Sequence, residues 1–428
     1  MRNTTRPSHA TAAAPPAPGR DARARPRATI LAALALPLLA AGCHYHDDSS
    51  YNYYPPVEVA YGVASADFNG DGFADVVQLS TVQPIQAYGT SNFKAYLSSG
   101  ATGFAAPALT SAGTDPLFVV AADINGDGFP DVATASYDDG AIAVFFNNQS
   151  SPGTFNPPLY LPSQGASQLA VGDMTGDGLP DIVSADFNVS LFVQTSPGTF
   201  AAGVPLYSGG ANWVAVGDLN GDGMPDIALT DAVGVKLLMH TGAASSTSYA
   251  PPVSVFTQTA NANLTGANII AIADVDGDGL NDLIITDPGP TGGMAATVNV
   301  LLQDPANPSG FKAPVPYPIA TQDVAQSIVM AHLTDPAKWD IVIGEEASVT
   351  VLLHDPANPG QFLAATVYPA AEAGGVAVAD VNGDGLPDIV VANGVTQPAV
   401  GGVTTTHPGV LLQSATTPGS FAALADFP

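Results

Sequence analysis

The strongest constraint on the fold is a nine-residue pattern that recurs along the chain and is complete in DLNGDGMPD, residues 218–226. Oxygen-bearing side chains stand at its first, third, fifth and ninth positions, and glycines stand at the fourth and sixth. Glycine permits the positive φ or close backbone approach that a chain needs to fold around an ion. Hard cations such as Ca²⁺ take about six to eight oxygen ligands, which alternating Asp and Asn can supply. The pattern predicts a cation-binding loop.

Six good copies of the pattern and a seventh, degraded copy are spread over the chain. They start at Asp67, Asp123, Asp173, Asp218, Asp274, His332 and Asp380. The separations between starts are 56, 50, 45, 56, 58 and 48 residues. Repeats of roughly 20 to 50 residues indicate solenoids, propellers or arrays. This repeat outweighs the length of 428 residues, which alone would allow two or three domains.

Each unit carries four short apolar runs bounded by Gly, Pro, Asn and Asp. One run precedes the loop, one follows it, a third comes next, and a fourth begins with Phe. Examples from different units are residues 213–216, 388–391, 298–302 and 311–314, in that order. Such runs are strands joined by turns, and no sustained helical period is present after the leader. Four strands in each of seven units predict an all-β, seven-bladed β-propeller of four-stranded antiparallel blades with Ca²⁺-binding hairpin loops. A β-solenoid is the alternative, although its rungs would be shorter and more uniform.

The sequence leaves the closure of the ring open. Residues 53–57 and residues 421–424 both have the pattern of the outer, fourth strand, so either end of the chain can complete the last blade. The first run of each unit is expected to be innermost, because its small residues fit where blades crowd the axis. These small residues are Ala64, Ala121, Ala122, Gly172, Ala215 and Ala377.

The loops and the Phe-led outer strands together resemble the FG-GAP/VCBS repeats of integrin α-subunit propellers and of many secreted bacterial proteins. The resemblance covers nearly all of residues 60–428, and we assign residues 61–428 to the propeller. It implies Ca²⁺ in the hairpin loop between the first and second strands, with a main-chain carbonyl at position seven and side chains at positions one, three, five and nine as ligands. For about six sites, the implied side chains are Asp67, Asn69, Asp71, Asp75, Asp123, Asn125, Asp127, Asp131, Asp173, Thr175, Asp177, Asp181, Asp218, Asn220, Asp222, Asp226, Asp274, Asp276, Asp278, Asp282, Asp380, Asn382, Asp384 and Asp388.

Three of the seven loops depart from the common form. Thr175 is a weaker, neutral ligand, and Asp276 adds a charge. In the loop that starts at His332, Pro336 replaces the central Asp, both glycines are gone and Lys338 adds a positive charge, so we expect no Ca²⁺ there. His332 as a ligand for a transition metal is the alternative to a plain surface residue. Position twelve holds no Glu in the good copies, which excludes an EF-hand.

Hairpin turns made by Asp-Gly and Asn-Gly are the alternative explanation of the good loops. A turn needs one Asp or Asn, whereas three or four converging carboxylates repel one another unless a cation offsets them. Beyond residue 42 the chain has 37 acids, four lysines and no arginine, a net charge of −33, and 19 of these acids lie in the six good loops. The acid content therefore favours Ca²⁺.

Residues 1–42 predict a lipoprotein signal peptide. All six arginines precede residue 28, and the apolar run that follows, residues 30–41, is too short to span a bilayer. LAAGC at 39–43 resembles a bacterial lipobox, whose cysteine is lipidated, and an ordinary signal peptide with a chance cysteine is the alternative. Cys43 is the only cysteine, so no intrachain disulfide can form. We expect secretion across the inner membrane, a tether and possible closing strand over residues 43–60, and lipid anchoring at the outer membrane or cell surface.

The acidic composition limits the partners. A net charge of −33 repels phosphate backbones and anionic lipids, which disfavours nucleic-acid binding and leaves the lipid as the only expected contact with a membrane. Without arginine the chain has no group to grip a carboxylate or phosphate bidentately.

Aligning the units shows a second set of positions, thirteen residues after each motif start. They hold Ser80, Ser136, Asp186, Asp231, Asp287, Glu345 and Asn393. Four acids on adjacent blades (Asp186, Asp231, Asp287 and Glu345) are predicted at the face opposite the metal loops. They are a possible ligand rim for a cationic group, a further metal or sugar hydroxyls, and turn capping is the alternative. Trp213 and Trp339 are candidates for sugar stacking, although buried packing is favoured.

Two classes of function fit these features. The first is a surface-anchored, Ca²⁺-binding adhesion or binding module for a glycan or a protein. The second is an extracellular enzyme acting on polysaccharides, a lyase or hydrolase, since some use related propellers. We find no recognisable nucleophile–base motif, no HExxH and no Gly-rich phosphate loop, which favours binding. A scaffold lipoprotein is a third reading, and neither the partner nor the oligomeric state follows from the sequence.

Overall fold

A computed structural model describes most of the chain beyond residue 56. The described residues are 57–83, 91–100, 103–114, 116–242, 247–257, 269–288, 296–307, 310–319, 325–370, 373–400 and 403–426. The chain divides into Met1–Asp47 and Asp48–Pro428, and only the second unit contains described residues. The leader, Cys43 and residues 43–56 of the expected tether therefore lie outside the described part.

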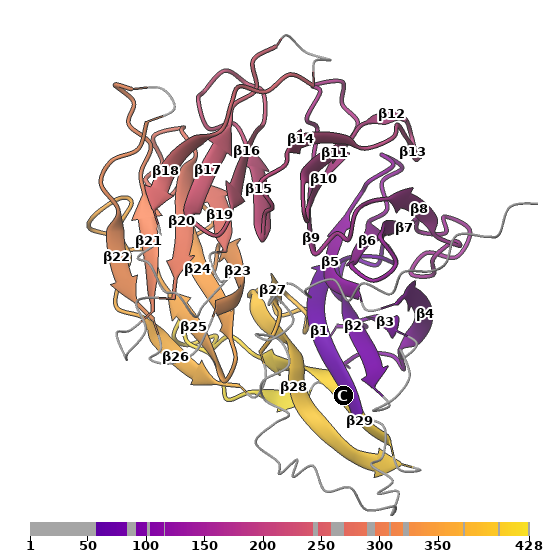
Figure 1. Cartoon of the computed structure of the whole chain (residues 1–428). Coiled ribbons are helices and arrows are strands. Elements are labelled where there is room, and N and C mark those ends of the chain that lie inside the picture. Colours follow the sequence, from indigo (N-terminus) through magenta and orange to yellow (C-terminus); the bar gives the residue numbers. More distant parts are fainter. Residues whose placement is uncertain are drawn as a thin grey trace, which may run out of the picture. The chain divides into compact units, whose positions relative to one another are not determined.

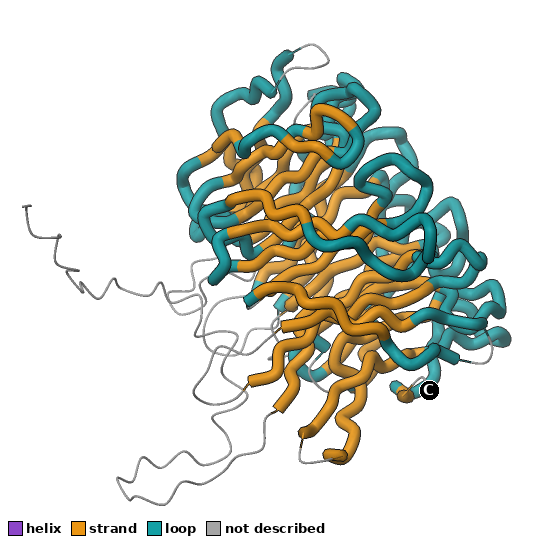
Figure 2. The backbone as a smooth tube through the Cα atoms, turned by 90° about the vertical axis from the view of Figure 1, so that its right-hand side faces the viewer, coloured by secondary structure: helices purple, strands orange, loops and turns teal. Residues whose placement is uncertain are grey.

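The described residues form thirty β-strands and no helix, and most strands belong to seven groups of four antiparallel strands (Figure 1). Each group is one blade, and the blades are numbered 1 to 7 in chain order. Figure 2 shows strands of neighbouring blades stacked side by side, with loops at their ends. No helix in the described residues is long and apolar enough to cross a membrane. The predicted all-β, seven-bladed β-propeller is confirmed.

Within each blade the strands run from the axis outward in chain order. The innermost strands are β1 (Val57–Ala66), β5 (Pro116–Ala122), β9 (Gln168–Gly172), β15 (Trp213–Gly217), β19 (Ile270–Ala273), β23 (Ala325–Ala331) and β27 (Val376–Ala379). The second strands are β2 (Asp75–Gln83), β6 (Asp131–Ser136), β10 (Asp181–Ala185), β16 (Asp226–Thr230), β20 (Asp282–Asp287), β24 (Asp340–Glu345) and β28 (Asp388–Val400).

The two outer positions complete each blade. The third strands are β3 (Ser91–Tyr96), β7 (Ala141–Phe145), β11 (Val189–Phe192), β17 (Gly234–Leu238), β21 (Thr297–Leu301), β25 (Ser348–Leu352) and β29 (Val403–Leu411). The fourth strands are β4 (Ala108–Gly113), β8 (Leu159–Pro162), β14 (Val204–Tyr207), β18 (Val253–Thr257), β22 (Val315–Pro318), β26 (Thr366–Pro369) and β30 (Ala425–Asp426). Blade 3 adds a small hairpin of β12 (Gln194–Ser196) and β13 (Thr199–Phe200).

The innermost strands contact one another in a closed ring. Each contacts the innermost strand of the next blade, and β1 contacts both β5 and β27. Small residues allow this approach: a Cβ added at Gly172 would stand 3.1 Å from Val216 of the next blade, and one at Gly217 would stand 3.0 Å from Ile272. Glycine and alanine on these strands therefore let seven blades meet at the axis.

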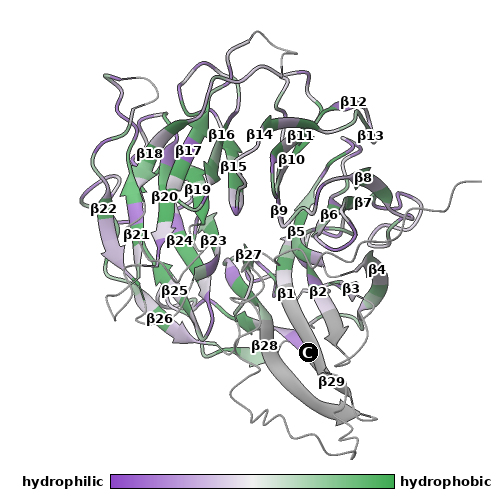
Figure 3. Ribbon diagram, viewed as in Figure 1, coloured by the Kyte–Doolittle hydropathy of each residue, from purple (hydrophilic) through white to green (hydrophobic). Residues whose placement is uncertain are grey.

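Apolar side chains pack between neighbouring blades. The described strands are largely hydrophobic along their length (Figure 3). Between blades 1 and 2, Phe93 and Phe145 are fully buried, with ring centroids 5.0 Å apart in an edge-to-face arrangement. Full burial of one such ring stabilises the fold by roughly 1.5–3 kcal/mol. Because every blade shares such a core with its neighbours, the blades depend on one another for stability.

Ring closure, which the sequence left open, is made within blade 7 by the C-terminal segment. β30 follows residues 421–424 and pairs with β29. At the other end, residues 57–60 belong to the innermost strand β1 rather than to an outer strand or a tether. A single parallel pair, Val57 with Thr404, joins blades 1 and 7 into one eight-stranded sheet.

Candidate metal centres

Each nine-residue pattern forms the hairpin between the first and second strands of a blade, and its ninth residue is the first residue of the second strand. In all six good loops both glycines adopt positive φ, for example 76° at Gly221 and 86° at Gly223. Residues with a Cβ rarely adopt this conformation. The glycine spacing thus decides the shape of the loop.

The oxygens of the first, third and fifth positions turn inward. In the loop of blade 4, Asp218 Oδ1 accepts from the backbone N–H of Gly221 at 2.7 Å, and its Oδ2 accepts from that of Gly223 at 2.8 Å. Asn220 Oδ1 accepts from Asp222 N–H at 2.9 Å, and Asp222 Oδ1 accepts from Met224 N–H at 2.9 Å. A carboxylate offers about four acceptor sites, so these bonds leave capacity for a cation.

The ninth-position aspartate is buried and ties the loop to the outer part of its blade. Asp226 is 0 % exposed; its Oδ2 accepts from Leu219 N–H at 2.8 Å and its Oδ1 from His240 N–H at 2.7 Å. The degraded loop of blade 6 keeps this arrangement, with Leu333 N–H and His354 N–H donating to Asp340 at 2.9 and 2.8 Å. The ninth aspartate therefore has a structural role even where the rest of the pattern is lost.

Burial raises the pKa of the ninth-position aspartates in the six good loops. The pKa rises to about 6 for Asp75, Asp131, Asp181, Asp226 and Asp388, and to about 7 for Asp282. Desolvation is the main cause; backbone N–H donors oppose it, and the other loop carboxylates add to it. A bound divalent cation would reverse this effect, because it favours the ionised carboxylate.

In several blades, a polar side chain of the next blade donates a hydrogen bond to a backbone carbonyl of the loop. We call this hydrogen bond a clasp. Asn147 of blade 2 donates its side-chain N–H to Phe68 O in the loop of blade 1 at 2.8 Å, and its backbone N–H to Asp131 Oδ1 in its own blade at 2.8 Å. Gln194 links blade 3 to Ile124 of blade 2 in the same way, at 2.8 Å. These bonds couple the loops of blades 1 and 2 to the blade boundaries beside them.

The same clasp joins further blades. Gln303 of blade 5 donates to Leu219 O of blade 4, and Ser98 Oγ of blade 1 donates to Val381 O of blade 7 at 3.0 Å. Sequence reasoning missed these residues, although a signal exists. In every blade, the residue at the position of Asn147 pairs with the aromatic residue of the following outer segment. In blades 2, 5, 6 and 7 these two residues are eight positions apart in the sequence. The bridging pairs are Ser98–Phe104, Asn147–Phe155, Gln194–Phe200, His240–Tyr249, Gln303–Phe311, His354–Phe362 and Gln413–Phe421.

The loop of blade 5 has the most concentrated acid. Among the described residues it holds the one group of three acids, Asp274, Asp276 and Asp282, whose carboxylate oxygens all lie within 4.8 Å of one another. The other good loops carry Asn or Thr at the third position. Carboxylate and amide oxygens are the ligands that Ca²⁺ prefers, so the donor set of these loops fits that ion.

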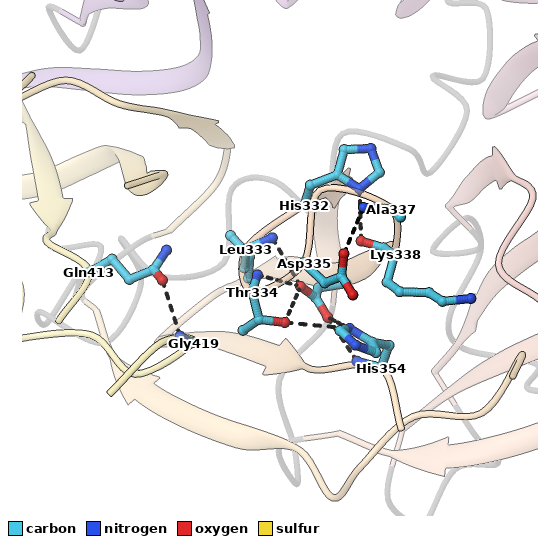
Figure 4. A network of polar contacts seen from close by, with 10 residues as sticks. His332, Leu333, Thr334, Asp335, Ala337, Lys338, His354, Gln413 and Gly419 are labelled. Carbon is cyan, nitrogen blue, oxygen red and sulfur yellow. Dashed lines mark hydrogen bonds and ion pairs between the residues drawn. The ribbon is translucent and has the colours of Figure 1, made fainter. Parts of the chain in front are cut away.

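The sixth loop is organised without glycines or a central carboxylate (Figure 4). His332 Nδ1 lies 2.7 Å from Lys338 O, and the His332 ring lies 3.9 Å from that of Trp339 between centroids. His354 Nδ1 lies 2.8 Å from Asp340 Oδ1. In the described residues no three ligand side chains gather at this loop, and hydrogen bonds and ring packing account for its histidines.

The two tryptophans take part in packing between blades. Trp213 and Trp339 are partly buried against the apolar cluster of blades 5 and 6, and Trp213 packs edge-to-face on Phe118 with centroids 5.5 Å apart. This position accounts for both rings without a ligand.

The four acids of the possible ligand rim lie at the ends of the second strands away from the loops, and they are buried. Their exposed fractions are 7 % for Asp186, 8 % for Asp231, 6 % for Asp287 and 0 % for Glu345. Asp231 pairs with Lys236 of the same hairpin, and Glu345 accepts from Ser348 Oγ at 2.5 Å. Asp231 also accepts from Tyr207 Oη of blade 3 at 2.9 Å, and the role of the four acids as a ligand rim stays a prediction.

Two hollows lie beside each other at the boundary of blades 2 and 3. One, of about 330 Å³, lies between β8 and the β12–β13 hairpin and includes Tyr160 and Phe200 in its wall. The other, of about 260 Å³, includes Gln164, Asn188 and Phe192. Tyr160 of blade 2 is 54 % exposed, and Phe187 of blade 3, which precedes Asn188, is 52 % exposed. This boundary offers apolar rings beside amide groups.

The family model of the FG-GAP-like repeat matches residues 67–134, 123–184, 173–229 and 338–391, which together make up half of the chain. The chain belongs to the FG-GAP-like repeat family. This confirms the resemblance seen in the sequence, since three matches run from the start of a good loop into the second strand of the next blade, and the fourth starts in the degraded loop of blade 6 and ends in β28. No curated protein matches this FG-GAP-like repeat protein.

Solved structures resemble this chain at low sequence identity. A lectin from Agrocybe aegerita, described as recognising non-reducing terminal N-acetylglucosamine, is 20% identical over 74% of this chain and 81% of the lectin, with a TM-score of 0.51. A putative 6-phosphogluconolactonase from Bacteroides fragilis is 15% identical over 72% and 82%, with a TM-score of 0.45. The V. cholerae biofilm matrix protein Bap1 is 12% identical over 86% and 89%, with a TM-score of 0.38. The likeness to the lectin is one of fold alone.

Proposed function

We propose that this FG-GAP-like repeat protein is a calcium-binding propeller, anchored at the cell surface through Cys43, that binds a glycan or a protein partner. The observation that carries the proposal is the repetition of one loop geometry. Six loops share two glycines at positive φ and inward-turned oxygens at the first position, and each has a buried ninth aspartate. Such loops have the donors for one calcium ion each.

Calcium has a structural role in this proposal. The loops lie at blade boundaries and are clasped by residues such as Asn147 and Gln194 of the next blade. An ion that binds the folded loop and not the unfolded chain stabilises the fold by mass action. It also offsets the repulsion among the three or four carboxylates of each good loop. The metal loops are then the framework, and the partner binds elsewhere.

The boundary of blades 2 and 3 is the surface that we propose for a glycan. Exposed rings such as Tyr160 present flat apolar faces to the C–H faces of a sugar, and the amides of Gln164 and Asn188 can exchange hydrogen bonds with its hydroxyls. Binding sites commonly combine apolar walls with a few polar groups. The absence of arginine beyond residue 27 favours a neutral sugar over an anionic one.

A glycan array and a cell-surface pull-down, each with calcium and with chelator, test the proposal. Terminal N-acetylglucosamine is a suitable first probe, because the lectin of similar fold is described as recognising it. We expect Tyr160→Ala to weaken glycan binding. Leu109→Ala, at the corresponding outer strand of blade 1 and 65 % exposed, is the matched control and should bind as the wild type does. Turnover of a polysaccharide by the purified protein would overturn the binding module in favour of an enzyme.

A further inference from the structure

The fifth metal loop, residues 274–282, differs from the others in its charge and in its surroundings. It is the only good loop with four aspartates. Beyond residue 42 the chain has four lysines, Lys94, Lys236, Lys312 and Lys338. Two of these four, Lys312 and Lys338, reach the fifth loop, which is the loop with the extra carboxylate.

The two lysines approach the loop from different blades. Lys312 lies in the Phe-led outer segment of blade 5, and its Nζ lies 3.9 Å from Asp276 Oδ2. Lys338 belongs to the degraded loop of blade 6, and its Nζ lies 3.5 Å from the point where a Cβ on Gly277 would stand. Gly360 of blade 6 also packs on Asp276, since a Cβ added there would stand 2.9 Å from Asp276 Cβ. The extra carboxylate therefore lies at the boundary of blades 5 and 6.

The carboxylates of this loop need a counter-charge more than those of the other loops. Three of them have oxygens within 4.8 Å of one another. Like charges at this distance repel, and an ammonium group held nearby reduces that repulsion whether or not a metal is bound. Lys338 stands where the sixth loop has lost both its glycines and its central carboxylate.

We propose that Lys338 and Lys312 are tethered counter-ions of the fifth metal loop, so that the blade without a site of its own supplies a cation to its neighbour's site. The part of this inference that concerns calcium rests on the proposed function. The lysines hold the loop together when calcium is absent, and they lower its affinity for calcium because the ion must bind beside fixed positive charge.

The size of the effect on affinity follows from the separation of the charges. One ammonium beside a divalent ion, in a medium as polar as water, would weaken binding by roughly 3- to 10-fold. Salt at about 0.15 M screens charges over about 8 Å, so the effect shrinks as ionic strength rises. Removing both lysines should therefore strengthen calcium binding at the fifth loop by about 10-fold or more at low salt.

Hydrogen exchange of the full chain, followed by mass spectrometry, reads each loop separately. The peptide over 274–282 carries the amides of Gly277 and Gly279, which donate to Asp274. In chelator, Lys338→Gln and Lys312→Gln should raise exchange in this peptide and leave the peptide over 218–226 unchanged. In a calcium titration at low salt, the double variant should protect the fifth loop at about 10-fold lower calcium than the wild type.

Asn220→Asp is the matched control, since it gives the loop of blade 4 a fourth carboxylate with no lysine beside it. We expect it to loosen that loop in chelator and to increase its calcium affinity. Unchanged exchange at 274–282 in the double variant, with and without calcium, would overturn the counter-ion role. If calcium protects no loop, the proposed function fails, and the chelator measurement still decides whether the lysines hold the fifth loop together.

Discussion

Removing the clasp between blades 2 and 3 tests whether these links stabilise the ring. Gln194 is 0 % exposed; its Nε2 donates to Ile124 O at 2.8 Å and to Pro180 O at 2.7 Å. Its Oε1 accepts from Gly198 N–H at 2.5 Å. Gln194→Ala would leave two carbonyls and one N–H without these partners at the blade boundary.

The expected loss of stability follows from these three unpaired groups. A buried polar group left without a hydrogen bond costs about 1–3 kcal/mol, so three such groups cost roughly 3–6 kcal/mol after partial relaxation. For a chain of this size we expect the melting temperature to fall by about 10 °C, since 1 kcal/mol shifts it by roughly 2–4 °C in large domains. Gln194→Glu should also destabilise the protein, because a carboxylate has a similar size but cannot donate to the two carbonyls.

The assay is thermal unfolding followed by circular dichroism in calcium buffer, together with urea unfolding. Gln361→Ala is the matched control, because Gln361 is exposed and its backbone N–H, which the substitution keeps, is bonded to Asn358 O. It should unfold within about 0.5 kcal/mol of the wild type. Equal melting temperatures for Gln194→Ala and Gln361→Ala would refute the claim that the clasp stabilises the blade boundary.

Three further predictions concern the loops and the leader. In chelator, stability should fall as pH rises from about 4 to about 7. Burial raises the pKa of the ninth-position aspartates to about 6 or 7, so the folded protein binds more protons there than the unfolded chain. The calcium-induced rise in melting temperature should grow over the same pH range, and a metal-free stability that does not change with pH would contradict this. Asp222→Asn should lower the bound calcium by about one ion with little effect in chelator, whereas Asp226→Ala should destabilise the protein in both buffers, as its buried oxygens accept from Leu219 and His240. Labelling of cells with a fatty-acid analogue should tag the wild type and miss Cys43→Ser, and equal labelling would contradict a lipid anchor at that residue.

The repeat allowed most of the architecture to be predicted from the sequence. The spacing of Asp and Gly in the loops is local, and the structure shows those residues in one hairpin per blade, with the glycines at positive φ. Four short strands per unit could likewise be recognised from apolar runs and turn residues. These features depend on neighbours in the sequence, which is why they could be read without the fold.

Features that depend on contacts between blades could not be predicted. Asn147 and Gln194 look like ordinary loop residues until the fold places them against carbonyls of the preceding blade. The burial of Asp231 and Glu345 depends on how the hairpins pack, and the alignment of units gave only their shared position. The pairing of β30 with β29, which completes blade 7, is set by the ring as a whole.

Calcium content most directly tests the claim that each of the six good loops binds one calcium ion. The protein is purified in calcium and dialysed against calcium-free buffer, and its calcium content is then measured by elemental mass spectrometry beside its melting curve in chelator. It should contain about six calcium ions per chain, one for each good loop. Removal of the ions should lower its melting temperature. A protein without calcium, whose melting temperature is the same with and without chelator, would contradict the account.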